Sequence, residues 1–238
     1  MQSHSEDKNL PREPSRLLGA LARELKNPLV LIARQAELEK SKGSNQAFDS
    51  LQKTAEKTLR LIDGYLLMAQ TEYGQRSLPL ETVGIGAVIY DVINGLRLHG
   101  QHNNVDFYYE VKDANVMAHR EGLKTVIWSL SELALIRDYD REEKRQKVVI
   151  RTAVKDEKVS VDILGSALDI SGSDIDLARR LQGTSHYALG NKLDESGIRM
   201  AIADVLAESL GSKLHAKKNK GLRGLSLDLL VSKQLQLV

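Results

Sequence analysis

Proline placement most constrains how this 238-residue chain can fold. The four prolines all lie in the first third of the chain: Pro11, Pro14, Pro28 and Pro79. Because proline removes a backbone donor and clashes with the preceding helical turn, its distribution limits where long regular elements form. The asymmetry predicts two regions of different construction. We divide the chain into a flexible N-terminal segment over 1–15, a helical region over 16–76 and a mixed region over 77–238.

Apolar residues recur at helical spacing on both sides of a turn in the helical region. After the turn at Gly43-Ser44-Asn45, and after a first heptad, the apolar steps alternate between four and three residues. The apolar positions of this second helix are Phe48, Ala55, Leu59, Ile62, Leu66 and Ala69. Two helices joined by a short turn form an antiparallel hairpin with one broad apolar stripe. Pairing with a second copy would cover the stripe as a four-helix bundle. The alternative is that the stripe packs on this chain's own second half.

The mixed region alternates between helical and strand patterns. Helices are predicted over 85–99, 120–138 and 197–210, and strands over 105–111, 148–152, 159–163, 213–215 and 225–229. This order predicts an α/β sandwich with helices on one side of a mixed sheet. The fold class that we predict for the whole chain is therefore α+β, with an N-terminal helical hairpin followed by the sandwich.

Composition excludes several classes of site. The chain has no cysteine, which rules out disulfides, thiolate zinc sites and cysteine nucleophiles. No uncharged stretch approaches the roughly 20 apolar residues of a membrane-spanning helix, and the N-terminus lacks the apolar core of a secretion signal. The formal net charge is only +2. We therefore expect a cytoplasmic protein without membrane insertion and without a nucleic-acid partner.

The stretch 21–29, Leu-Ala-Arg-Glu-Leu-Lys-Asn-Pro-Leu, resembles the H-box of sensor histidine kinases. Pro28 lies where the family has its helix-bending proline. Weaker matches follow in the family's order at 78–81, 116–126 and 196–212. The resemblance implies a dimerisation hairpin followed by an ATP-binding domain of the GHKL type. It covers nearly the whole chain from Arg16 to Leu230.

The phospho-acceptor position of the H-box departs from the family. Arg23 stands where the family has its phosphorylated histidine, and a guanidinium offers only donors and stays protonated. The six histidines all lie outside the hairpin: His4, His99, His102, His119, His186 and His215. We expect no autophosphorylation, although relay of phosphate through an unconventional residue remains a third hypothesis.

The positions that the resemblance assigns to nucleotide binding also depart from the family. Leu133 stands at the metal-binding asparagine of the N-box, and Glu132 lies one step around the helix. Strand parity places Ile163 at the adenine-reading aspartate and turns Asp162 the other way. Of the glycine boxes Gly165 and Gly197 remain. Ala167 and Arg199 replace two other glycines, and the Arg199 side chain should intrude on the phosphate loop unless it contacts a phosphate itself. We therefore expect loss of ATP and magnesium binding, no cofactor and no kinase activity.

One chemical remnant lies in the H-box. Glu24 and Asn27 keep the family's Glu-x-x-Asn spacing, which places both side chains on one helix face. They offer an alternative function, hydrolysis of the aspartyl phosphate of a response regulator. With Arg23 and Lys26 they form the expected partner-binding surface. The predicted function is a catalytically inactive, dimeric docking scaffold for a receiver domain or another histidine kinase.

Three further features have simpler readings. His99 and His102 have metal-ligand spacing but no evident third ligand, so we expect no metal site. The basic run 213–223 is expected to be a solvated hairpin tip rather than a nucleic-acid patch. The segment 182–195 corresponds to the family's ATP lid and could serve as a mobile binding loop.

Overall fold

The computed structural model describes residues 25, 28, 30–32, 46–72, 78–102, 105–135, 146–166, 168, 170–181 and 195–233. Its centre is a five-stranded mixed sheet with the strand order β2-β4-β5-β7-β6. The strands are β2 (Val105–Glu110), β4 (Gln146–Lys155), β5 (Lys158–Gly165), β6 (His215–Asn219) and β7 (Leu222–Leu230). Only the β2–β4 pair is parallel. The β4–β5, β5–β7 and β6–β7 pairs are antiparallel.

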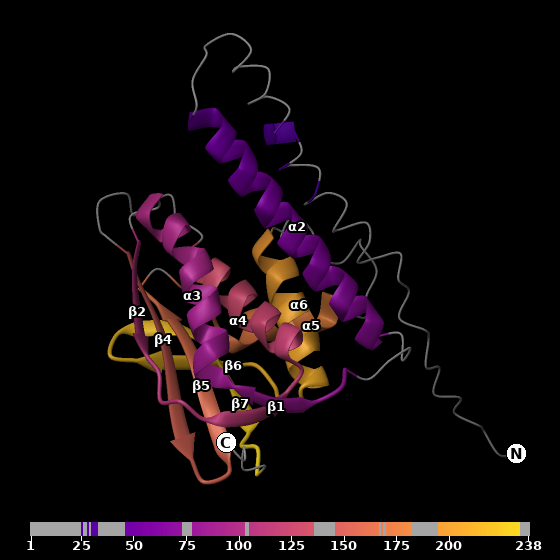
Figure 1. Ribbon diagram of the computed structural model, residues 1–238, viewed down its shortest axis with the longest axis vertical. Helices are drawn as coiled ribbons and strands as arrows, with labels where there is room; N and C mark the ends of the chain where they lie inside the picture. Colours follow the sequence, from indigo (N-terminus) through magenta and orange to yellow (C-terminus); the bar gives the residue numbers. More distant parts are fainter. Residues whose placement is uncertain are drawn as a thin grey trace, which may run out of the picture.

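Helices cover one face of this sheet, as Figure 1 shows. They are α3 (Ile85–His102), α4 (Arg120–Leu135), α5 (Gly172–Leu181) and α6 (Glu195–Ser209). The core lies between α3, α4, α6 and the alternate residues Val159, Val161 and Ile163 of β5. This arrangement confirms the predicted α+β fold class and the sandwich with helices on one side of a mixed sheet.

Tight turns fix the register of the two hairpins in the sheet. Asp156 and Lys220 have φ values of 55° and 46°, and Gly221 has a φ of 83°. Positive φ in a two-residue turn matches the right-handed twist of the strands that it joins. Helix α6 ends at Ser209 and is followed by Gly211, which has a φ of 73°. Ser212 N donates to Ala207 O and Gly211 N donates to Glu208 O, both at 2.9 Å. This pair of hydrogen bonds is a Schellman motif.

Sequence patterns missed three elements. The strands β1 (Glu81–Gly84) and β3 (Asn115–Ala118) pair antiparallel as a separate two-stranded sheet. Four residues are too few to establish a period of two, so neither strand has a recognisable pattern. Helix α5 is also absent from the predicted helices. The predicted final hairpin is present as β6 and β7, but the strand predicted over 213–215 shares only His215 with β6. Most of the basic run therefore lies in strands, and only Lys220 and Gly221 form the turn.

Helix α2 (Gln46–Glu72) crosses above the sandwich and packs on α6 and α4 (Figure 1). Its packed face carries Leu61, Tyr65 and Met68, which belong to the same core as the sheet. The predicted stripe lies on another face, where Leu59 and Leu66 are 58% and 53% exposed. The alternative that this stripe packs on the chain's own second half is therefore wrong for these two residues. Among the helices that the structure describes, none is long and apolar enough to cross a membrane.

Candidate functional site

The H-box residues predicted to meet a partner lie outside the described residues. These are Arg23, Glu24, Lys26 and Asn27. Two neighbours in the same stretch are described: Leu25 and Pro28 are helical and half-buried. Val30 and Leu31 are exposed. The predicted role of this surface therefore stays a prediction.

Two of the predicted nucleotide-site positions are buried in the apolar core. Leu133 of α4 is 5% exposed and Ile163 of β5 is 1% exposed. Ile163 pairs with Ile150 on one side and Leu225 on the other. The predicted strand parity is confirmed, because Asp162 does not join this core. Neither side chain offers an oxygen ligand to a metal or an acceptor to an adenine amino group.

Gly165 lies at the end of β5, and a leucine side chain packs directly over it. A Cβ atom placed on Gly165 would lie 3.0 Å from Leu168 Cδ1. Leu168 is itself 9% exposed and part of the core. The remaining glycine of this box thus allows close apolar packing at the strand end.

The Arg199 side chain was expected to intrude on the phosphate loop, and the structure instead places it in a contact between two helices. Its side chain is only 2% exposed, and its guanidinium donates to Glu132 Oε2 across the contact between α6 and α4. Glu132 is 6% exposed, so the two charges form a buried ion pair. Sequence analysis noted Glu132 only because it lies one step around the helix from the metal-binding position. Gly197, in the first turn of α6, is half-buried.

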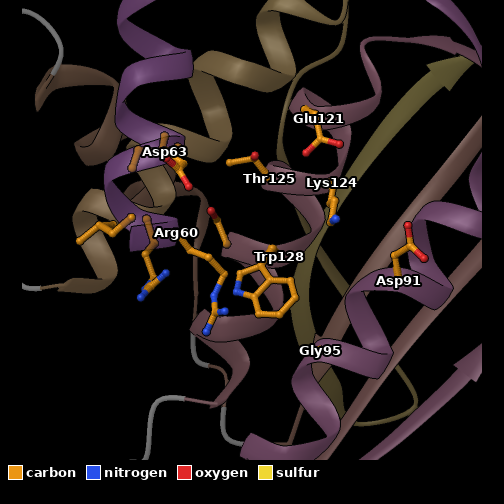
Figure 2. A pocket seen from close by; sticks show the side chains of 13 residues that line it. Arg60, Asp63, Asp91, Gly95, Glu121, Lys124, Thr125 and Trp128 are labelled. Atoms are coloured by element: carbon orange, nitrogen blue, oxygen red, sulfur yellow. The ribbon is translucent and has the colours of Figure 1, made fainter. Parts of the chain in front are cut away.

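A second arginine joins this pair from α2. The Arg60 guanidinium lies over the Trp128 ring, 4.5 Å from its centroid, as Figure 2 shows. Burial lowers the pKa of Arg60 below its ordinary value, the carboxylates of Glu132 and Glu56 oppose that shift, and the Arg199 charge adds to it. Arg60 therefore shares an electrostatic environment with the buried pair. This side chain links α2 to α4 and α6, a connection that no sequence pattern indicated.

Two buried aspartates form ion pairs that sequence analysis did not predict. Asp204 of α6 has no exposed surface and accepts two hydrogen bonds of 2.9 Å from Arg179 of α5. The Asp204 carboxylate raises the pKa of Arg179. Asp162, on the face of the sheet away from Ile163, accepts hydrogen bonds of 2.6 Å from both Arg151 and Ser226. An aspartate inside an apolar helix or strand pattern is the signal that could have indicated each ion pair.

Burial by itself would raise the pKa of Asp162. The hydrogen bonds from Ser226 and Arg151, with the charges of Lys217 and Arg151, outweigh burial and hold the pKa below the ordinary value. Asp162 is therefore a structural anion on the outer face of the sheet, and its partners come from β4, β6 and β7.

A cavity of about 450 Å³ lies where α2 meets α3, α4 and α6 (Figure 2). Its lining includes Arg199 but none of Leu133, Ile163 and Gly165. Of the predicted nucleotide positions, Arg199 is therefore the one that this cavity shares. In the part of the chain that the structure describes, no three histidine, aspartate or glutamate side chains gather as metal ligands.

Known structures share this fold. No protein-family model and no curated protein matches the sequence. The Acinetobacter baumannii histidine kinase AdeS has 14% identity and a TM-score of 0.59, over 88% of this chain and 98% of that chain. The mycobacterial sensor histidine kinase MprB has 15% identity and a TM-score of 0.51, over 64% of this chain and 97% of that one. Histidine kinase ThkA, crystallised with the response regulator protein TrrA, has 17% identity and a TM-score of 0.54, over 90% and 61%.

The fold is thus that of the histidine kinases, with helices that correspond to the dimerisation hairpin followed by the ATPase-type sandwich. At these identities the likeness establishes architecture alone.

Proposed function

We propose that this chain is a catalytically inactive, histidine-kinase-like signalling protein that binds neither ATP nor magnesium. The observation that carries the proposal is the burial of Leu133 and Ile163 in the apolar core at the positions where the resemblance expects a metal ligand and an adenine reader. Arg199, at a former glycine, is occupied by its buried pairing with Glu132. Together with Arg23 at the phospho-acceptor position, these substitutions remove both the donor and the acceptor of a phosphoryl group.

Calorimetry with ATP and magnesium tests this loss of nucleotide binding. We expect no saturable heat up to millimolar nucleotide, and no radiolabel transferred to the protein from ATP. A dissociation constant in the micromolar range would contradict the proposal. Phosphopeptide mapping after incubation with phosphorylated partners would address relay through another residue.

The proposed role is docking, with a response-regulator receiver or another histidine kinase as the partner. The solved complex of ThkA with TrrA supports a receiver domain as the partner class. The docking surface would be the H-box face with Arg23, Glu24, Lys26 and Asn27. Substitution of Arg23 and Lys26 by glutamate should abolish receiver binding, whereas glutamate at Lys218, a distant exposed lysine of β6, should leave it unchanged.

We further propose a homodimer formed through the helical hairpin. The exposed Leu59 and Leu66 support it, because they lie on the predicted stripe and remain uncovered in the single chain. Light scattering should give twice the mass of 26.5 kDa. The double substitution of these two leucines by glutamate should give monomers, and a monomeric wild type would contradict this part of the proposal.

A second candidate function is dephosphorylation of a receiver by Glu24 and Asn27. The retained Glu-x-x-Asn spacing favours it, because an amide at that place can orient a water molecule toward an aspartyl phosphate. The test is the rate of phosphate loss from a phosphorylated receiver, which Asn27→Ala should abolish. Asn45→Ala, in the predicted turn, provides a matched control. Equal rates with and without the protein would remove this candidate.

A further inference from the structure

The five-stranded sheet ends at β6, and no strand among the described residues pairs with its other edge (Figure 1). The turn Lys220-Gly221 has two residues, so the flanking pair Asn219 and Leu222 exchanges both of its hydrogen bonds. Hydrogen-bonded pairs alternate along an antiparallel ladder, which turns the N–H and C=O groups of Ala216 and Lys218 away from β7. Both residues are exposed. The free edge of β6 therefore presents backbone donors and acceptors that no described strand uses.

Helix α5 contacts β6, and its printed hydrogen bond lies at the beginning of this edge. Arg179 Nη2 donates to Leu214 O at 3.1 Å, directly before β6 starts at His215. Ala216 and Lys218 lie further along the strand and remain exposed. An exposed edge strand is a template for pairing with another chain, and lysine side chains ordinarily prevent that pairing. A strand that pairs here must therefore carry the opposite charge.

The hairpin of β6 and β7 is strongly basic. The chain has no aspartate or glutamate over 209–227, and this span holds five basic residues: Lys213, Lys217, Lys218, Lys220 and Arg223. Lys217 Nζ lies 3.9 Å from Asp162 Oδ1, but that carboxylate already accepts shorter hydrogen bonds from two other side chains. Within the described part of the chain, Lys213, Lys218 and Lys220 form no ion pair. Successive side chains of a strand point to opposite faces, so Lys217 and Lys218 place a cation on each face of the free edge.

We propose that the free edge of β6 pairs with an extended acidic segment of a partner protein, which adds a further strand to the sheet. The backbone groups of Ala216 and Lys218 form the ladder, and the lysines beside the edge bind the carboxylates of the segment. Opposite charge removes the obstacle that edge lysines present to a neutral strand. This surface is separate from the H-box face and does not depend on the proposed docking of a receiver.

Fluorescence anisotropy with labelled peptides tests the pairing. The probe is a peptide of about eight residues that alternates glutamate with valine, the length of an ordinary strand. Its matched control alternates glutamate with proline, which keeps the charge and removes the N–H of every second residue. We expect saturable binding of the glutamate–valine peptide at low salt, weakening as salt rises, and at least ~10-fold weaker binding of the control.

Three results would overturn the proposal. The first is the absence of saturable binding by the glutamate–valine peptide. The second is equal binding of both peptides, because charge alone would then account for it. The third is adsorption of the protein to vesicles that contain phosphatidylserine without binding of the peptide, which would assign the basic edge to an anionic membrane surface.

Substitution of Ala216 separates backbone pairing from charge. Ala216→Pro removes a donor that faces the free edge, so the β6–β7 ladder keeps its hydrogen bonds, and edge strands tolerate proline at such positions. It should abolish the preference for the glutamate–valine peptide. Ala216→Ser retains the donor and should bind as the wild type does. Wild-type affinity in a folded Ala216→Pro variant would refute the pairing.

Charge reversal at the edge tests the role of the lysines. Lys218→Glu should weaken binding of the glutamate–valine peptide at least ~5-fold. Arg97→Glu makes the same change of charge on an exposed position of α3 and should leave binding unchanged. Equal affinities of these two variants would refute the assigned charge complementarity. If Ala216→Pro does not fold, this pair of variants and the proline peptide decide the proposal. Since Lys218→Glu should keep receiver binding, its loss of peptide binding distinguishes this surface from the H-box face.

Discussion

Helix α4 contributes to two environments that contrast sharply. It contributes Leu133 and other side chains to the apolar core, where Ile163 of β5, a second position assigned to nucleotide binding, is also buried. Toward α2 it presents Lys124, Thr125 and Trp128 around an open, charged cavity. One helix thus holds both a region where polar chemistry is absent and a region where it is concentrated.

The difference indicates which substitutions should cost the most stability. On the sheet side, stability follows from burial of aliphatic surface, and neighbouring side chains of similar volume could exchange with modest cost. On the α2 side, the buried Glu132–Arg199 pair depends on both partners. Removing one charge leaves the other buried and unpaired, which costs far more than a change of shape.

The largest effect is expected from breaking that ion pair. Arg199→Met should lower the free energy of unfolding by ~3–5 kcal/mol, because Glu132 would remain buried without a counter-charge. Urea denaturation followed by circular dichroism measures the loss. The double variant with Glu132→Leu is the control, since it removes both charges and should recover most of the stability. A double variant as unstable as Arg199→Met would show that shape rather than charge governs this contact.

A smaller effect should separate the two faces of α2. Met68 is fully buried where α2 packs, and Met68→Ala should cost ~3 kcal/mol at every protein concentration. Leu66 lies about 200° around the helix and is 53% exposed. In the monomer, Leu66→Ala should cost less than ~0.5 kcal/mol. A cost for Leu66→Ala that grows with protein concentration would assign its face to the dimer, and equal costs for both substitutions in the monomer would contradict the two-face description.

Sequence patterns predicted the sandwich because its longer elements have strong periods. The alternation of Val159, Val161 and Ile163 gave both the strand and the face on which Ile163 lies, and the structure confirms that parity. The apolar steps of α2 predicted a helix but indicated only one of its two faces. Leu61, Tyr65 and Met68 fall between the members of the predicted stripe, so the face that packs on α6 was missed.

The partners in the ion pairs could not be predicted, because they lie far apart in the chain. Glu132 and Arg199 are 67 positions apart, and nothing in either helical pattern indicates the other. The cavity depends in the same way on Arg60 meeting Trp128 across a helix contact. Resemblance to a family draws attention to the residues that the family uses. The resemblance therefore indicated that Arg199 replaces a glycine, but it did not indicate the ion pair with Glu132.

The smallest effect concerns the outer face of the sheet and its dependence on pH. The pKa of Asp162 is held below its ordinary value in the folded state, mainly by Ser226 and Arg151 against the opposing effect of burial. Its stabilising contribution is therefore fully present above the unfolded pKa, near 3.9, and is lost as the pH falls through the lower folded pKa. Asp162→Asn keeps the shape and should cost ~2 kcal/mol at pH 7, with the difference from wild type shrinking below about pH 4. Urea midpoints across this pH range measure it, with Asp156→Asn in the exposed β4–β5 turn as the control. A difference that is constant with pH would mean that hydrogen-bond geometry, and not the charge of Asp162, stabilises this face.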